Sequence, residues 1–306
     1  MGSALKQTMS NDKGNSNQPY ILGHSDHELN RLRAQARFLE PDTRQFLLDA
    51  GVKRGMRILD VGSGAGEVAF LAAELVGEAG IVLGTDKAPA AVAAATQAAQ
   101  NRGFSNIQFL EGNPAEMTFE TRFDAVIGRY VLPFQDEPSA MLRGLAKHLD
   151  HSGLLIFHEP DWTCVRSFPP APLYDRACRW ISDTTQLSGQ SWNFLEKAHT
   201  IFVGADLPAP TMRMHTFIAG DFNTREWLIA VGDIVESLLP AMVRLGVATV
   251  EEVNIWTFRD RLLQDVTSNR SVIVGRSEIG IWTTIGRDAT QKTAASDCEH
   301  PDSASL

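Results

Sequence analysis

The sequence predicts an α/β protein built on an open, mostly parallel sheet with helices on both faces. Three observations support this fold class: one strand turns directly into glycines and a helix, further short apolar runs end in polar residues, and helical patterns separate these runs. The first observation comes from residues 58–67, Ile-Leu-Asp-Val-Gly-Ser-Gly-Ala-Gly-Glu. A buried strand, a turn without side chains and a helix start make the nucleotide-binding unit of open α/β sheets.

The glycine turn favours a ligand that lacks a phosphate. Gly62, Gly64 and Gly66 alternate, but the third glycine of the dinucleotide fingerprint would stand where this chain has Glu67. Asp60, at the strand end, adds a second carboxylate. Both negative charges would repel a diphosphate, whereas a cationic or amino-bearing ligand would be attracted.

Polar residues follow the next predicted strands, which span residues 81–86, 107–110, 123–128 and 154–158. Asp86 ends the first of these, where a carboxylate can accept hydrogen bonds from both hydroxyls of a ribose. Asn113, after the second, offers the donor and acceptor that an adenine edge needs. Arg129 follows the third, and His158 and Glu159 stand at the end of the fourth.

Taken in this order, four features of the chain resemble the motifs of the class I S-adenosylmethionine-dependent methyltransferases, over about residues 52–160. They are the segment from Asp60 to Gly66, then Asp86, Asn113 and Arg129. The resemblance implies a Rossmann-like, seven-stranded, mostly parallel sheet and S-adenosylmethionine as the cofactor. In that family the glycine turn holds the amino acid part of the cofactor, the second acid the ribose and the third-strand loop the adenine. By position, cofactor binding is assigned to Asp60, Gly62, Ser63, Gly64, Gly66, Asp86, Lys87, Asn113, Pro114 and Arg129. Many members carry aspartate in place of Asn113, so we expect altered affinity for the cofactor rather than lost binding.

The rest of the chain adds an N-terminal helical cap and helical insertions to this core. Two cap helices are expected, over residues 27–40 and 43–50, with Gly51 as the stop. In the family such a leader folds over the mouth of the cofactor site, so Tyr20 is included among the cofactor-binding residues, although packing at the surface is the preferred explanation for it. The expected division is a disordered leader 1–19, the cap 20–51, a cofactor-binding core 52–162, a helical segment 163–210, a sixth strand 211–220, a helical lid 221–270, final strands 271–287 and a disordered tail 288–306.

Five of the six tryptophans lie outside the core strands, at Trp162, Trp180, Trp192, Trp227 and Trp256. They line a pocket for a flat, apolar substrate, or they form the small core that inserted helices need for themselves. We expect the second role for most of them and a place at the ligand for at least one.

Composition excludes several classes of function. The net charge of −9 and the lack of a basic stripe argue against a nucleic-acid partner. No apolar run is long enough to span a membrane, and the polar N-terminus lacks the core of a signal peptide. Three cysteines without CxxC spacing indicate a reducing compartment, so we expect the cytoplasm. A homo-oligomer is left open.

Methyl transfer from a sulfonium requires alignment and exclusion of water more than acid–base chemistry. His158 is the best candidate for a base, with an orienting hydrogen bond as its alternative role, and Glu159 is the second candidate. Too few acids converge there for a metal, and none is expected.

The predicted function is methyl transfer to a small, largely apolar metabolite of secondary metabolism, with oxygen as the preferred acceptor atom. Carbon methylation of an isoprenoid or aromatic intermediate, with or without cyclisation, is the nearest alternative. An NAD-dependent oxidoreductase and a regulator that only binds the cofactor are the other readings left open.

Overall fold

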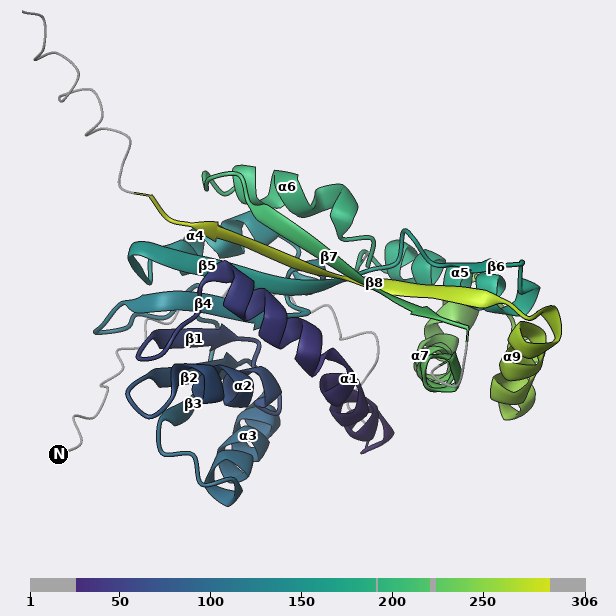
Figure 1. The fold of residues 1–306 in the computed structure, drawn as a ribbon, viewed down its shortest axis with the longest axis horizontal. Coiled ribbons are helices and arrows are strands. Elements are labelled where there is room, and N and C mark those ends of the chain that lie inside the picture. Colours follow the sequence, from purple (N-terminus) through teal and green to yellow (C-terminus); the bar gives the residue numbers. More distant parts are fainter. Residues whose placement is uncertain (1–25, 191, 221–223, 287–306) are drawn as a thin grey trace, which may run out of the picture.

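The computed structural model describes residues 26–190, 192–220 and 224–286, with side chains from residue 38 onward. One eight-stranded sheet runs in the order β3-β2-β1-β4-β5-β8-β6, and β7 pairs with β8 outside this path (Figure 1). β1 to β5 are mutually parallel where they pair, and β8 is antiparallel to β5, β6 and β7. The strands are β1 Arg57–Val61, β2 Ile81–Asp86, β3 Ile107–Glu111, β4 Phe123–Arg129, β5 Leu149–Asp161, β6 Arg166–Phe168, β7 Thr211–Ala219 and β8 Val272–Thr284.

The predicted fold class is confirmed, with eight strands instead of seven. The additional strand, β6, is only three residues long and pairs with residues 272–274 of β8. Its sequence, Arg-Ser-Phe, is too short to show the alternation by which a strand is recognised.

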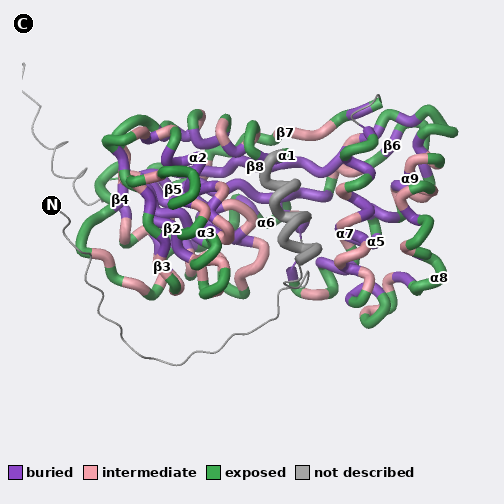
Figure 2. Tube along the Cα trace, turned by 90° about the horizontal axis from the view of Figure 1, so that it is seen from below, coloured by how far each residue is buried: buried purple, intermediate pink, exposed green. Residues whose placement is uncertain are grey.

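Successive residues of the central strands enter opposite hydrophobic layers. Ile58 packs with α1 and α2 on one face, while Leu59 packs with α4 on the other. Figure 2 shows the buried residues running along the sheet between these layers. The helices of the two faces are α1 Asp26–Ala50, α2 Glu67–Val76, α3 Pro89–Asn101, α4 Pro138–Ala146 and α6 Leu195–Val203, and the short 3₁₀ helix η1 covers Leu132–Phe134.

A third hydrophobic core lies at the far end of β8, among helices inserted after β5 and β7 (Figure 1). We call it the helical module; it contains α5 Pro172–Leu187, α7 Thr224–Leu245, α8 Val250–Val253 and α9 Ile255–Asn269. Trp162, Trp180, Trp192 and Trp227 are buried in this core, whereas Trp256 is 92% exposed. The expectation that most of these tryptophans serve the insertions' own core is therefore confirmed.

The two expected cap helices are one continuous helix, α1, that contains Pro41. Pro41 lacks the backbone N–H of a regular turn, but the helix is held against the sheet by buried Leu39, Phe46 and Leu47. Gly51 ends it as predicted, with a positive φ of 103° and a hydrogen bond from the Val52 N–H to the Leu47 carbonyl.

The two expected final strands are also one element, β8, because its polar centre does not break the strand. Arg276 and Glu278 lie two residues apart, on the same face, and the Arg276 Nε donates to Glu278 Oε1 at 2.6 Å. Between them Ser277 Oγ lies 2.7 Å from the Thr216 hydroxyl of β7. Each polar side chain thus has a partner within the buried sheet.

The contact between α1 and β8 leaves no room for a side chain at Gly280. A Cβ there would lie 2.4 Å from the ring of Phe46. We expect Gly280→Ala to lower the free energy of unfolding by about 1–3 kcal/mol, because the added methyl group would overpack the core. Urea denaturation measures this change. Gly286→Ala is the control, since nothing lies within 4 Å of that position, and equal effects of the two substitutions would contradict the packing argument.

Candidate active site

The glycine turn has the backbone geometry that only glycine adopts without strain. Gly62, Gly64 and Gly66 have φ values of 65°, 51° and 92°. A Cβ at Gly64 would meet nothing within 4 Å, so this residue faces open space. A Cβ at Gly66 would lie 2.8 Å from both Phe70 and Phe109, so this glycine permits close packing of α2 on the sheet. The turn thereby exposes its backbone beyond the carboxyl end of β1.

Asp60 is buried beside this turn and lacks a full set of partners. Its side chain sits in the centre of the sheet, between Gly84 of β2 and Ile127 of β4, and the residue is 1% exposed. Burial raises the pKa of the Asp60 carboxyl to about 8, against the opposing charge of Arg129. Among the residues that the structure describes, its Oδ2 has no hydrogen-bond partner, and neither has the buried hydroxyl of Ser63. An ammonium or sulfonium group next to Asp60 would supply the missing interaction.

Asp86 braces the same turn from the neighbouring strand. Its Oδ2 accepts a hydrogen bond from the Gly64 N–H, and its Oδ1 accepts one from the Ala88 N–H, both at 2.9 Å. Each carboxylate oxygen can accept a second hydrogen bond, so a role toward a ribose is compatible with this geometry. That role stays a prediction, as does any role for the exposed Lys87.

The loop after β3 is held by hydrogen bonds of its own. Asn113 Nδ2 donates to Glu116 at 2.6 Å, and its Oδ1 accepts from the Ala115 N–H at 3.2 Å. The carbonyl of buried Pro114 lies 2.7 Å from His148 Nε2. These contacts fix the loop beyond the carboxyl end of β3, while the assignment of Asn113 and Pro114 to the adenine stays a prediction.

Arg129 connects the turn to α1. Its Nη1 donates to the Thr43 hydroxyl at 3.1 Å, and burial lowers its pKa against the charges of Tyr130 and Asp60. Thr43 also contacts His158, with 3.0 Å between its Oγ1 and Nδ1 of the imidazole. α1 thus contributes a buried polar group, Thr43, to the carboxyl edge of the sheet, and sequence reasoning missed it.

His158 lies in a closed polar network in which both ring nitrogens have partners. Nδ1 faces Thr43, and Nε2 lies 2.9 Å from Glu278 Oε2. Burial lowers the pKa of His158, so the ring is neutral near pH 7. Although burial alone would raise the pKa of Glu278, the charge of Arg276 and the hydrogen bond from His158 lower it to about 2. A neutral ring that donates to this carboxylate carries its proton on Nε2 and leaves Nδ1 unprotonated beside Thr43, whose own hydroxyl donates to the Leu39 carbonyl at 2.9 Å.

Tyr130 completes the network from the loop after β4. It adopts a left-handed conformation, with φ 59°, and its hydroxyl donates to Glu278 at 2.8 Å. Arg276 lies over its ring, 5.5 Å from the centroid. Tyr130 was one of the candidates expected at the strand ends, whereas Arg276 and Glu278 were not assigned a role from the sequence. The signal for these two is a pair of opposite charges two residues apart within an apolar strand.

Glu159 faces away from this network and organises η1. Its carboxylate accepts hydrogen bonds from the N–H groups of Val131, at 3.1 and 3.2 Å, and of Leu132, at 3.0 Å. Burial raises its pKa to about 8. These contacts favour a positioning role for Glu159 over proton transfer, because its oxygens already hold the loop.

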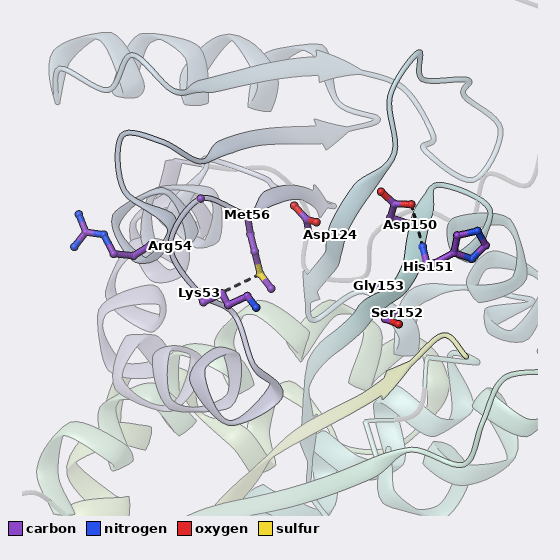
Figure 3. Close-up of a pocket in the computed structure, with 9 residues that line it drawn as sticks. Lys53, Arg54, Met56, Asp124, Asp150, His151, Ser152 and Gly153 are labelled. Carbon is purple, nitrogen blue, oxygen red and sulfur yellow. Dashed lines mark hydrogen bonds between the residues drawn. The ribbon is translucent and has the colours of Figure 1, made fainter. Parts of the chain in front are cut away.

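Two further features bear on the site. Tyr20 lies outside the described residues, so its predicted contact with the cofactor stays a prediction. Figure 3 shows a shallow pocket of about 320 Å³ at the opposite, amino edge of the sheet, lined by Lys53, Arg54, Asp124, His151 and neighbouring residues. Asp124 there accepts a hydrogen bond from the Arg57 N–H, which supports its structural role. This pocket is remote from the glycine turn.

Comparison with known proteins identifies the fold and the turn. A model of the methyltransferase domain matches residues 52–198. Aklanonic acid methyltransferase DauC of Streptomyces sp. (strain C5) is 35% identical over 129 residues, 42% of this chain and 59% of that protein. Nocamycin O-methyltransferase of Saccharothrix syringae is 38% identical over 90 residues, which are 29% of this chain and 32% of that protein. The chain therefore spans less than two thirds of the length of either relative.

A longer alignment reaches demethylmenaquinone methyltransferase of Lactococcus lactis, which is 27% identical over 66% of this chain and 77% of that protein. Among solved structures, the YcgJ protein of Bacillus subtilis shares the fold with a TM-score of 0.53 at 18% identity, over 81% of this chain and 99% of that one. The matched domain, the strand order and the acid-plus-glycine turn define a nucleotide-binding methyltransferase fold. The matched region, residues 52–198, is a methyltransferase domain of the class I S-adenosylmethionine-dependent kind.

The residues at the turn fit the family's cofactor, S-adenosylmethionine. The unpartnered Asp60 oxygen suits a cationic group, and the glycines leave space beside it. Among the described residues no three His, Cys, Asp or Glu side chains gather as metal ligands, and metal independence stays a prediction. In the same part of the chain no helix is both long and apolar enough to cross a bilayer.

We expect the affinity for S-adenosylmethionine to rise with pH between about 6 and 8. In the free protein Asp60 is protonated below its pKa of about 8, and binding of a cation requires that proton to leave. The dissociation constant should fall by up to about tenfold per pH unit in this range. Calorimetry at several pH values measures it. Asp60→Asn is the control and should bind weakly and independently of pH; a flat profile in the wild type would contradict the assignment.

We expect Glu278→Gln to destabilise the protein by about 3–5 kcal/mol at pH 7, because it leaves Arg276 buried without a charge partner. The exposed Arg44–Glu74 pair provides the control, and Glu74→Gln should cost about 0–1 kcal/mol. The lowered pKa of Glu278 adds a pH signature: its contribution is present above about pH 5 and is lost toward pH 2. The free energies of unfolding of wild type and variant, measured by denaturant titration, should therefore become equal as the pH falls toward 2.

Proposed function

We propose that this protein transfers the methyl group of S-adenosylmethionine to a small, largely apolar metabolite, with oxygen as the acceptor atom. The observation on which this rests most is Asp60, a buried carboxyl with a free oxygen beside a glycine turn. When bound, S-adenosylmethionine supplies an electrophilic methyl carbon. DauC and the nocamycin enzyme, which by name methylate small natural products, support this choice of acceptor class.

Carbon methylation of a quinone is the second candidate. The observation in its favour is the alignment with demethylmenaquinone methyltransferase, which reaches across 66% of this chain. Both candidates place the methyl acceptor beyond the carboxyl ends of β4 and β5, where open α/β sheets bind their ligands. A nicotinamide oxidoreductase is not retained, because the matched family is that of methyltransferases.

Within this proposal His158 is a positioning residue and not the base. Its Nε2 is held by Glu278 and its Nδ1 lies against the Thr43 hydroxyl, and the residue is only 3% exposed, so the ring is fixed on both sides and shielded from a substrate. Its part is to keep α1, β5 and β8 in register around the site. This corresponds to the second of the two roles considered for His158 from the sequence.

We expect His158→Gln to leave the dissociation constant of S-adenosylmethionine within about threefold and to lower kcat by about tenfold or more, since misaligned groups lose rate and not cofactor binding. Formation of S-adenosylhomocysteine with naphthol and naphthoquinol acceptors measures kcat. The acid limb of the pH profile should be the same in variant and wild type. Disappearance of that limb would identify His158 as the base, and absence of product with every acceptor would refute the proposed function.

A further inference from the structure

Three buried tryptophans form a row that runs from η1 into the core of the helical module. The ring centroids of Trp162 and Trp192 are 6.2 Å apart, and those of Trp162 and Trp227 are 5.9 Å apart. Phe134 of η1 continues the row, 6.4 Å from Trp192. The three indoles are between 1% and 5% exposed.

The three indoles differ in one respect, the partner of the ring N–H. Trp227 Nε1 donates to the Tyr174 hydroxyl at 2.9 Å, and that hydroxyl donates to the Val274 carbonyl. The Nε1 atoms of Trp162 and Trp192 are buried without a partner in the described part of the chain. The Oε1 of Gln190, two residues before Trp192, is likewise buried and unpartnered.

Packing alone does not account for these atoms. Leaving a buried donor unpaired costs about 1–3 kcal/mol, and buried indole N–H groups usually find a partner. The same core satisfies Trp227 with a tyrosine, so it has side chains that serve this purpose. Two unpaired donors on neighbouring rings, with an unpaired acceptor two residues before one of them in the chain, therefore indicate a ligand.

The topology places these groups on the acceptor side of the sheet. β4 and β5 pair as far as Arg129 and His158, and β5 continues beyond that point to Asp161. There Asp161 bridges to Asn193, next to Trp192. Trp162 and Trp192 thus lie past the carboxyl ends of β4 and β5, where a methyl acceptor would lie relative to the glycine turn.

We propose that the indole N–H groups of Trp162 and Trp192 donate hydrogen bonds to a carbonyl oxygen of a flat, polycyclic aromatic acceptor, and that Gln190 Oε1 accepts one from a hydroxyl of the same molecule. The inference rests on the proposed function, and it adds the chemical class of the acceptor. A neutral carbonyl is favoured over a carboxylate because buried Asp161 adjoins Trp162.

The test compares 9-fluorenone with fluorene, two flat tricycles that differ in one carbonyl oxygen. Calorimetry on the full chain, with S-adenosylhomocysteine present, should show about tenfold tighter binding of the ketone, as expected for one or two hydrogen bonds. Trp162→Phe and Trp192→Phe keep an aromatic ring but remove the N–H, and each should reduce this preference to about threefold or less. Trp180→Phe makes the same change elsewhere in this core and should keep the preference for 9-fluorenone.

A measurement on the wild type guards against variants that do not fold. With ¹⁵N-labelled indoles, two of the six tryptophan cross-peaks should shift on addition of 9-fluorenone and stay in place with fluorene. Equal affinity for the two tricycles, binding of neither, or a preference that survives both substitutions would overturn the inference. Failure to bind S-adenosylhomocysteine would instead refute the proposed function. In that case the preference for 9-fluorenone over fluorene is measured without S-adenosylhomocysteine.

Discussion

The hydrogen bonds of β8 are the constraint on which the rest of the structure depends. This strand is thirteen residues long, and it pairs with β5 and β6 along one edge and with β7 along the other. Since backbone groups buried in a sheet must be paired, a polar stretch can stay in such a strand only if its side chains are paired as well. Arg276, Ser277 and Glu278 meet this condition, and as a result a charged network lies midway between the sheet core and the helical module.

Two buried carboxyls show how partners decide the charge of a group. Glu278 is surrounded by Arg276, His158 and Tyr130, and it stays ionised with a pKa of about 2. Asp60 is just as buried, but one of its oxygens has no partner and its pKa is about 8. The first carboxyl is completed by the protein itself. We propose that a cationic ligand completes the second, which would distinguish a structural charge from a binding charge.

Local sequence was sufficient for the parts of the fold that local physics decides. The glycine turn, the positions of the parallel strands along the chain and the stop of α1 at Gly51 follow from residue types and spacing. The single helix through Pro41 and the unbroken β8 do not, because they depend on burial and on pairs formed across the fold. Thr43 could not be assigned to the site for the same reason: it reaches His158 from a helix 115 residues earlier in the chain.

The separate cores of the sheet and the helical module have a consequence for how such a protein diversifies. The turn to which we assign the cofactor belongs to β1 and α2, whereas the tryptophan row belongs mainly to the interior of the module. The two are linked through β5, β8 and the loop at η1, so the module can be repacked without disturbing the turn. Substitutions in that interior are therefore free to change which molecule is modified while the methyl donor remains the same.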